Sequence, residues 1–365
     1  MQTQAENAGA QEISRLLARG LQARGHRVKQ VFFFRRTAAF DDDPDALFCC
    51  ARRPGGPLAV ARFLLRLRAM IGSLKPDALV SFQHYGNLIA APIARAVGVP
   101  VIIANHVSAQ ASVSRAVARG DALIGRLGAY DAIVVNSRET EAVYARYAPA
   151  YARRLTRIDH GFAPKSSPLG KTAARAALGL PQDAPLLGCA ARLHPLKRLD
   201  AAIATLVFNA SHHLALAGEG ADRARLAALA QQLGVAARVH WLGELPASSI
   251  GVFLAALDVF VFPSAAETFG LAPVEAAQAG VLVIAADLPI LKDVLQVDGA
   301  PCALFAEVTD AAAFAAIIAA GLADQAGAAL LRERGRRLAD KYPLHVMVDS
   351  YARLIETLAA RADAH

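Results

Sequence analysis

The segment DVFVFPSAAETFGLAPVEAA, residues 258–277, holds a short apolar run, a turn and the start of a helix. Val259–Phe262 has the length and the β-branched and aromatic content of a buried strand. Pro273 suits the first turn of a helix that continues to Ala279. A strand that leads directly into a helix is the repeating unit of parallel α/β folds.

The same alternation of apolar runs and helical patterns extends in both directions along the chain. It predicts an α/β protein whose strands are separated by helices, which is the pattern of parallel sheets. Besides residues 259–262, the predicted strands are 31–34, 78–82, 101–104, 132–135, 157–159, 186–190, 213–217, 238–242, 281–285 and 302–305.

The chain is expected to form two domains, because 365 residues are too many for one ordinary core. A polar stretch with proline, glycine and serine at 163–171 reads as the linker. We therefore predict a first domain over 1–165, joined by a C-terminal helix at about 345–365, and a second over 166–344. Two such sheets in tandem would create a cleft, with ligands beyond the carboxyl ends of the strands.

The composition excludes several protein classes. Hydrophobic residues make up 55% of the chain, which excludes a disordered protein. No uncharged apolar run is long enough to predict a membrane-spanning helix, and charged residues interrupt the first thirty positions where a signal peptide would lie. The 4 cysteines lack metal-ligand spacing. These features favour a reduced, cytoplasmic protein.

Positive charge is concentrated in the first half of the sequence. Residues 1–165 contain 23 Lys and Arg against 12 Asp and Glu, a net charge of +11, whereas the rest of the chain carries −3. This asymmetry favours an anionic partner for the first half, such as a membrane surface, a lipid phosphate or nucleic acid. Arginines that merely cover solvent-facing surfaces would give the same composition.

Residues 58–74 form an amphipathic pattern in which one apolar face opposes Arg62 and Arg66. A basic amphipathic helix of this kind can lie on a membrane. More often such a helix covers a sheet, and the sequence favours that interpretation.

The start of the chain lacks an obvious first strand. Only MQTQAENA precedes the first amphipathic helix, and an α/β sheet of this type normally places a buried apolar strand there. We therefore expect a first domain without its first strand, either because the sequence is truncated or because another segment fills the position.

Two cations follow the predicted strand at 186–190. Arg192 and Lys197 lie five residues apart just beyond its end, a placement that suits the two phosphoryl groups of a diphosphate. A solvated basic turn would look the same. Glycines at 218 and 220 would let a backbone approach a ligand closely, although an ordinary tight turn explains them equally well.

Two carboxylates lie on either side of a glycine turn in the opening segment. Gly270 frees the backbone amides of Phe269, Gly270 and Leu271 to point at an anion near a helix N-terminus. Glu267 precedes this turn, and Glu275 lies within the helix. Carboxylates beside a phosphate are unfavourable unless they accept hydrogen bonds from neutral groups such as sugar hydroxyls. A nucleotide sugar meets both requirements, while helix N-terminal acids that complement the dipole are the plainer alternative.

Together these segments resemble a known family. The patterns A-R-L-x-P-x-K-x-L-D from residue 191 and P-S-x-x-E-x-F-G-L-x-x-x-E-A from residue 263 are similar to those of retaining glycosyltransferase family 4. That resemblance implies a GT-B fold, in which two Rossmann-like parallel-sheet domains face a central cleft. It covers essentially the whole chain, is specific from about 186 to 287, and is looser in the first half.

The resemblance also implies roles for the residues of the second domain. Arg192 and Lys197 would hold the diphosphate of the donor, together with the amides of 269–271. Glu275 would bind the ribose hydroxyls. Glu267 would bind hydroxyls of the donor sugar near the reacting carbon, and the resemblance implies that Glu267 and His106 are the catalytic residues.

In the first half, His106 matches the cleft histidine of the family and would lie near the donor sugar; taken alone, such a histidine would by default be packed or capping. The family is metal-independent, so the resemblance implies a nucleotide-sugar co-substrate and no cofactor or metal. Its retaining chemistry is usually described as front-face displacement. One departure is the segment His160-Gly161-Phe162-Ala163, where the family commonly has Asn-Gly-x-Asp.

Acceptor recognition in this family belongs to the first domain, which here is strongly basic. We expect the acceptor side to include four residues that follow a predicted strand: Gln83, His84, Tyr85 and Asn87. With the arginines of 52–68, they favour an amphiphilic or anionic acceptor such as a lipid-linked saccharide or a growing polysaccharide. Peripheral contact with the inner face of the membrane is a further hypothesis.

The sequence therefore predicts a glycosyltransferase that moves a sugar from a nucleotide-sugar donor to a saccharide or lipid-linked acceptor in glycan biosynthesis. A catalytically silent nucleotide-sugar binder is the main alternative, and a nucleotide-sugar epimerase is a lesser one. A nucleic-acid binder is disfavoured, because only 6% of residues are aromatic, the second half is acidic and no nucleic-acid motif is present.

Overall fold

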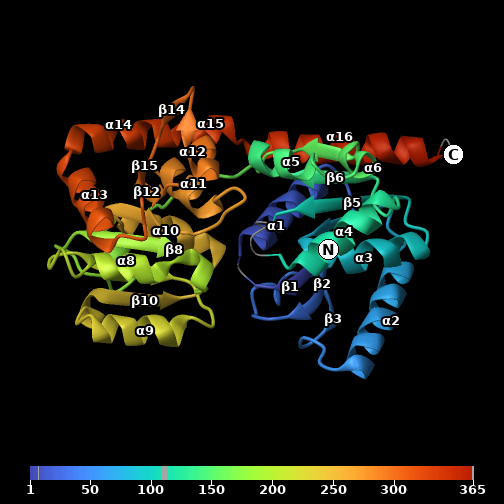
Figure 1. Ribbon diagram of the computed structural model, residues 1–365, viewed down its shortest axis with the longest axis horizontal. Helices are drawn as coiled ribbons and strands as arrows, with labels where there is room; N and C mark the ends of the chain where they lie inside the picture. The colour runs from blue at the N-terminus through green and yellow to red at the C-terminus, as the bar shows by residue number, and fades with distance from the viewer. Residues whose placement is uncertain (7, 108–112, 364–365) are drawn as a thin grey trace. The chain divides into compact units, whose positions relative to one another are not determined.

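The computed structural model describes residues 1–6, 8–107 and 113–363, and it divides the chain into two compact units (Figure 1). Unit 1 comprises Met1–Gly161 and Tyr342–His365, and unit 2 comprises Phe162–Lys341. The two points at which the chain passes between units lie a few residues from the domain boundaries expected from the sequence.

Unit 1 is built on parallel strands. One sheet has the order β1-β2-β3 and the other the order β4-β5-β6-β7. The strands are β1 Gln2–Ala5, β2 Gln30–Arg35, β3 Ala46–Cys50, β4 Ala78–Phe82, β5 Val101–His106, β6 Ala132–Val135 and β7 Leu155–Arg157. The helices are α1 Gly9–Gln22, α2 Pro57–Leu74, α3 His84–Ala96, α4 Arg115–Arg126, α5 Arg138–Tyr144, α6 Pro149–Ala152 and α16 Leu344–Asp363.

The expectation that unit 1 lacks its first strand is wrong. Strand β1 pairs in parallel with β2, and its start lies against β4. The amide of Phe82 donates to the carbonyl of Met1 at 3.0 Å, and the amine of Met1 donates to the carbonyl of Val80 at 2.5 Å. The strand order across unit 1 is thus β3-β2-β1-β4-β5-β6-β7.

The sequence analysis did not predict strand β1, because its sequence, QTQA, is polar although the strand lies inside the protein. The Gln2 side chain is 2% exposed and donates to the carbonyl of Ala10 at 2.8 Å. From α1, Gln11 donates to the carbonyl of Gln4 at 2.9 Å. These side-chain amides form hydrogen bonds inside the protein, so a strand without apolar alternation can still occupy the centre of the sheet.

Unit 2 contains one six-stranded parallel sheet and a small hairpin. The sheet has the order β10-β9-β8-β11-β12-β15. Its strands are β8 Leu186–Ala190, β9 His213–Ala217, β10 Val239–Gly243, β11 Val259–Phe262, β12 Leu282–Ala286 and β15 Leu304–Ala306, and the hairpin joins β13 Gln296–Val297 to β14 Ala300–Pro301. The helices are α7 Lys171–Ala177, α8 Leu199–Thr205, α9 Arg223–Gln232, α10 Ile250–Ala256, α11 Leu271–Gln278, α12 Pro289–Val294, α13 Ala311–Ala323, α14 Gln325–Arg336 and α15 Leu338–Lys341, with short 3-10 turns at Pro195–Lys197, Ala236–Arg238 and Ala247–Ser249.

The strand order of unit 2 defines a topological switch point between β8 and β11. The chain runs outward from β8 through β9 to β10, then crosses back to β11 and continues through β12 to β15 on the other side. In doubly wound sheets, the loops after the two central strands separate at this point and leave room for a ligand. The segment that opened the sequence analysis begins with one of these two strands.

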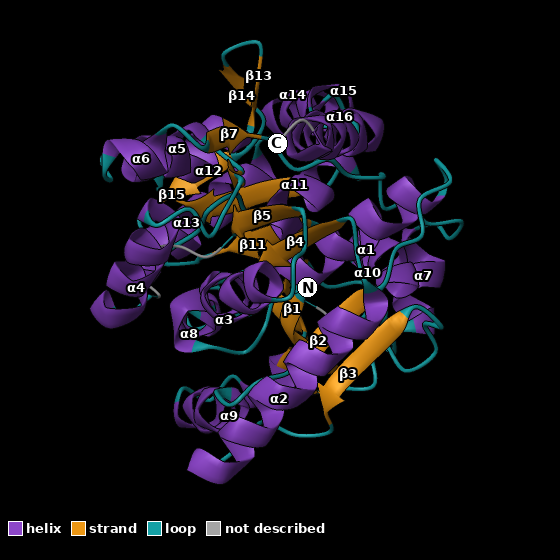
Figure 2. Cartoon of the chain, turned by 90° about the vertical axis from the view of Figure 1, so that its right-hand side faces the viewer, coloured by secondary structure: helices purple, strands orange, loops and turns teal. Residues whose placement is uncertain are grey.

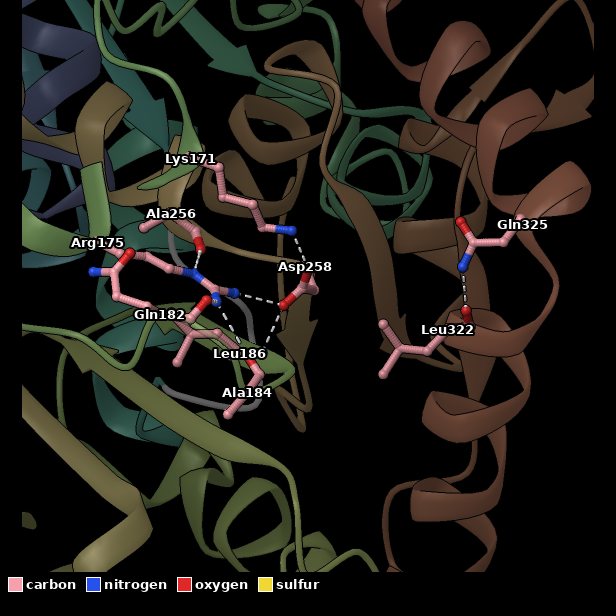
Figure 3. A network of polar contacts seen from close by, with 9 residues as sticks. All are labelled: Lys171, Arg175, Gln182, Ala184, Leu186, Ala256, Asp258, Leu322 and Gln325. Carbon is pink, nitrogen blue, oxygen red and sulfur yellow. Dashed lines mark hydrogen bonds and ion pairs between the residues drawn. The ribbon is translucent and has the colours of Figure 1, made fainter. Parts of the chain in front are cut away.

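The amino ends of β8 and β11 are joined by a partly buried ion pair (Figure 3). Arg175 of α7 donates to the Asp258 carboxylate at 2.7 Å, and the same carboxylate oxygen accepts from the amide of Leu186 at 2.7 Å. Arg175 also donates to the carbonyl of Ala256 at 2.9 Å, and Lys171 pairs with Asp258. This network holds the two central strands together at the end opposite their carboxyl termini.

Helix α2 covers the sheet of unit 1 with only part of its apolar surface. Figure 2 shows it beside β3, and Phe63, Leu67 and Ile71 are buried in the core there. Leu58 and Leu65 are 66% and 67% exposed, so the apolar surface of α2 is wider than the part that the sheet buries.

Within the described ranges, no individual helix has both the length and the apolar composition needed to cross a membrane. Ala311–Ala323 and Gln325–Lys341 satisfy that test only as a pair, with a bend of 90° between them.

Candidate functional site

The loop after β8 is held in place by its own neighbours in unit 2. The amide of Leu193 donates to the carbonyl of Glu219 at 2.9 Å, which extends the β8–β9 pairing beyond the strand ends. A Cβ at Gly218 would collide with the carbonyl of Ala191, and one at Gly220 with the carbonyl of Leu193. The glycines therefore permit this close backbone approach.

Arg192 and Lys197 both project from this loop. Arg192 is exposed, and Lys197 ends the 3-10 turn Pro195–Lys197 with its side chain 25% exposed. The structure thus holds the two predicted diphosphate-binding cations on one fixed loop beyond the carboxyl end of β8.

The loop after β11 is tied to the loop after β8. The carbonyl of Leu196 accepts hydrogen bonds from the amide of Ala265 at 2.8 Å and from the hydroxyl of Ser264 at 3.2 Å. Nζ of Lys197 lies 2.5 Å from Oε1 of Glu267, whose side chain is 12% exposed. The two predicted site residues therefore form an ion pair across the switch point.

Gly270 sets the direction of the turn into α11. Its φ of +83° lies in the left-handed region, which glycine adopts without steric cost, and α11 begins at Leu271. Phe269 is 3% exposed and packs on Phe162 with ring centroids 5.6 Å apart, which anchors the turn. The first amides of a helix have no acceptors within it, so this turn presents donors and the positive end of the helix dipole.

Glu275 lies in the second turn of α11 beside a cation that the sequence did not single out. Its Oε1 is 3.7 Å from Nζ of Lys165, and the two side chains are 13% and 15% exposed. Lys165 lies in the polar stretch that reads as a linker, where a lysine gives no signal of a site. Each predicted sugar-binding glutamate thus forms an ion pair with a different lysine.

The unit 2 site combines positive charge with two carboxylates. Arg192, Lys197 and Lys165 provide three cations, and the start of α11 adds a partial positive charge. Cations of this kind bind phosphoryl oxygens, while Glu267 and Glu275 can accept hydroxyl hydrogen bonds. The arrangement suits a ligand with an anionic diphosphate and neutral polyhydroxyl groups.

His106, the predicted catalytic histidine of unit 1, ends strand β5 and is 0% exposed. Its Nε2 lies 2.7 Å from the hydroxyl of Tyr151 and 3.4 Å from Oδ2 of Asp121. Burial lowers the pKa of His106 to about 3, so the ring is neutral at physiological pH.

His106 belongs to a buried aromatic cluster that the sequence analysis missed. The Asp121 carboxylate accepts hydrogen bonds from Tyr130 at 2.8 Å and from Tyr151 at 2.7 Å. The ring of Tyr144 stacks on His106 with centroids 4.1 Å apart, and its hydroxyl lies 2.9 Å from Nε2 of His84. The repeated tyrosines of YARYAPAYA, residues 144–152, were the available signal, since they place three aromatic rings close together in the sequence.

The four predicted acceptor-side residues lie in different environments. Tyr85 is 52% exposed, and Gln83 has an unusual backbone conformation with φ +68°. His84 is buried, which lowers its pKa to about 4. Asn87 is fully buried; its Oδ1 accepts from Ser81 at 2.6 Å, and its amide donates to the carbonyl of Asn105 at 3.1 Å. Asn87 therefore belongs to the internal framework, whereas Tyr85 faces solvent.

Two family models match consecutive parts of the chain. The model described as Glycosyltransferase Family 4 matches residues 8–165, and the model described as Glycosyl transferases group 1 matches residues 170–338. The chain belongs to glycosyltransferase family 4. The second match contains Arg192, Lys197, Glu267 and Glu275, and the first contains His106.

Solved structures with low sequence identity share the fold. Sucrose-phosphate synthase from Thermosynechococcus elongatus superposes with a TM-score of 0.78 at 23% identity, covering 98% of this chain and 96% of that one. HepE from Anabaena, in complex with UDP-glucose, superposes with a TM-score of 0.83 at 17% identity and 98% coverage of both chains. The α/β class and the GT-B arrangement of two Rossmann-like domains are therefore confirmed.

Curated family relatives are similar over a limited region. The D-inositol 3-phosphate glycosyltransferase of Stackebrandtia nassauensis is 35% identical over 170 residues, which cover 43% of this chain. That match spans 38% of the length of the relative.

Proposed function

We propose that this protein is a retaining glycosyltransferase that transfers a sugar from a nucleoside-diphosphate sugar to a saccharide or lipid-linked saccharide acceptor. One observation carries the proposal. At the switch point of unit 2, the Lys197–Glu267 pair joins the loops after β8 and β11, with a contact of 2.5 Å. A cation for the diphosphate and a carboxylate for sugar hydroxyls are thus held side by side.

The donor is assigned from the chemistry of this site. Arg192 and Lys197 bind the two phosphoryl groups, and the start of α11 adds its dipole. Glu275 accepts hydrogen bonds from ribose hydroxyls, and Glu267 accepts them from the transferred sugar. The UDP-glucose in the HepE structure, which has the same fold, supports a nucleotide sugar as the donor.

The reaction is proposed to proceed on one face of the sugar, as in the family that the chain resembles. The bond between the anomeric carbon and the diphosphate oxygen breaks, and a bond to the acceptor oxygen forms on the same side. The acceptor proton passes to the leaving diphosphate. Arg192, Lys197 and the helix N-terminus stabilise the charge that develops on the leaving group, which is the task a metal ion performs in other transferases. We therefore propose a metal-independent reaction in which His106 assists the transfer step.

The acceptor is proposed to be anionic or amphiphilic, and its binding is assigned to unit 1. The net charge of +11 over residues 1–165 favours an anion. The curated relatives, whose names give D-inositol 3-phosphate as their substrate, support an acceptor that carries phosphate. Tyr85 and Gln83 are the acceptor-side candidates that the fold leaves accessible.

We also propose that α2 brings the protein to the inner face of an anionic membrane. Leu58, Arg62 and Leu65 are exposed and follow one another at spacings of four and three, so they share one stripe of the helix. A basic amphipathic surface of this kind binds anionic lipids through buried apolar area and charge together.

The test is a donor turnover assay on the intact protein. UDP-, GDP- and ADP-glucose and -mannose are incubated with it in EDTA, with and without a lipid-linked saccharide or inositol phosphate, and nucleoside diphosphate release and product linkage are measured. We expect slow release without acceptor, faster release with a suitable acceptor, and a product that keeps the anomeric configuration of the donor. Donor binding without any release would indicate the silent binder, and inversion or a strict metal requirement would contradict the proposed mechanism.

A further inference from the structure

The buried cluster around His106 contains a chain of hydrogen bonds that ends at one nitrogen without a partner. Within residues 1–6, 8–107 and 113–363, Nδ1 of His106 is buried and has no hydrogen-bond partner, while Nε2 lies 2.7 Å from the Tyr151 hydroxyl. We infer that Asp121 and Tyr151 are positioning residues that hold the proton of His106 on Nε2 and leave Nδ1 as an acceptor for a substrate hydroxyl. This inference rests on the proposed role of His106 in the transfer.

The donor and acceptor roles in this chain of hydrogen bonds follow from the buried carboxylate of Asp121. Oδ1 of Asp121 accepts from Tyr130 at 2.8 Å, and Oδ2 accepts from Tyr151 at 2.7 Å, so an ionised Asp121 uses both hydroxyl protons. A tyrosine hydroxyl has a single proton. Because Tyr151 donates its proton to Asp121, its oxygen can only accept from His106, and Nε2 of His106 must therefore carry the proton.

The opposite tautomer would leave several groups unsatisfied. With the proton on Nδ1, a buried N–H group would lack an acceptor, and Tyr151 would have to donate to Nε2 instead of Asp121. The carboxylate would then lose one of the two hydrogen bonds that oppose the effect of its burial, which itself raises the pKa of Asp121. Removing a hydrogen bond from a buried charged group is among the costlier changes in a protein interior.

The hydrogen bonds and ring contacts of the cluster also restrain the orientation of the His106 imidazole. His106, Asp121, Tyr130 and Tyr151 are each no more than 1% exposed, and Tyr144 stacks on the His106 ring at an interplanar angle of 15°. A ring held on its face and at Nε2 cannot rotate to exchange its nitrogens. An acceptor nitrogen with a fixed direction suits recognition of one particular sugar hydroxyl. An imidazole that could adopt either tautomer would not discriminate between hydroxyl donors and acceptors.

The proposed tautomer of His106 is tested by nitrogen NMR of protein labelled in its histidine rings, because protonated and unprotonated ring nitrogens have different chemical shifts. The His106 signals are assigned by their loss in His106→Gln. In the wild type we expect the proton on Nε2. In Asp121→Asn we expect the His106 proton on Nδ1. Tyr130 has no other hydroxyl partner among the described residues, so it keeps donating to the amide oxygen of the new asparagine. The amide nitrogen then donates to the Tyr151 oxygen, and the Tyr151 hydroxyl donates its proton to Nε2 of His106.

The matched control is Tyr144→Phe. It keeps the ring that stacks on His106 and removes only the hydroxyl that lies 2.9 Å from His84. Its His106 tautomer should match that of the wild type. A tautomer change in this variant, or none in Asp121→Asn, would overturn the inference. A wild-type proton on Nδ1 would overturn it even if Asp121→Asn did not fold.

Turnover gives an independent measure. Asp121→Asn should lower kcat by about ten- to a hundredfold, as loss of supporting hydrogen bonds does at other sites. It should leave nucleoside diphosphate binding unchanged, because Asp121 lies in unit 1. An unchanged kcat would contradict the positioning role. Absence of turnover in the wild type would count against the proposed function alone, since the tautomer is read without substrate.

Discussion

Gln83 has a backbone conformation that residues other than glycine rarely adopt. Its φ of +68° and ψ of +154° lie close to a region used almost only by glycine, at the junction between β4 and α3. A non-glycine residue there costs about 1–3 kcal/mol and persists only when its side chain or surroundings require it. Because this junction lies at the carboxyl end of a central strand, the strain is best explained by a function of the side chain.

Gln83→Gly should therefore stabilise unit 1 while it impairs transfer. We expect the free energy of unfolding to rise by about 1 kcal/mol, since relief of strain exceeds the entropy cost of a glycine. Urea denaturation measures this change, and acceptor titration should show a higher acceptor KM. A destabilised variant would contradict the strain, and unchanged acceptor kinetics would contradict the role of Gln83 in acceptor binding.

At the residue scale, the sequence revealed types of side chain better than their partners. The motif around Lys197 and Glu267 indicated a phosphate site with sugar-binding carboxylates, but their direct contact depends on the adjacency of β8 and β11. Asp121 could not be found at all. Its partners come from positions 106, 130 and 151, and such long-range contacts leave no local pattern.

At the element scale, prediction succeeded where strands are apolar and failed where they are not. Residues 186–190, 213–217 and 259–262 coincide with β8, β9 and β11. Strand β1 was missed because it is polar and one of its two buried residues is Gln2, and β3 because its short run at the edge of the sheet lacks polar-apolar alternation. The register of these strands depends on pairing that sequence periodicity does not contain.

Helix α2 gives a prediction at this scale. The double variant Leu58→Ser with Leu65→Ser should reduce sedimentation with vesicles containing anionic phosphatidylglycerol, because it removes exposed apolar surface without touching the buried residues. Wild-type sedimentation should weaken as salt is raised, since the arginines contribute through charge.

The control is Leu330→Ser, which removes an exposed leucine, 46% accessible, from α14 of unit 2. It should sediment like the wild type. Equal loss in both variants would indicate non-specific adsorption, and absence of wild-type sedimentation would refute membrane contact through α2.

At the scale of the whole molecule, the alternation of strands and helices was sufficient to predict two α/β sheets. It could not give the order of their strands. The crossing from β10 back to β11 places two sequence-distant loops together, and only the fold reveals this switch point. The proposed donor site depends on that crossing, which brings the cations after β8 to the carboxylate and helix after β11.

The most direct test of this donor site is calorimetric titration of the protein with UDP, GDP and ADP. One nucleotide should bind, and Arg192→Ala should weaken it by about ten- to a hundredfold, the equivalent of a charge-assisted hydrogen bond. Arg332→Ala, which removes an arginine from α14, should bind like the wild type. Binding that survives Arg192→Ala, or no binding by any of the three nucleotides, would contradict the assignment of the switch point as the donor site.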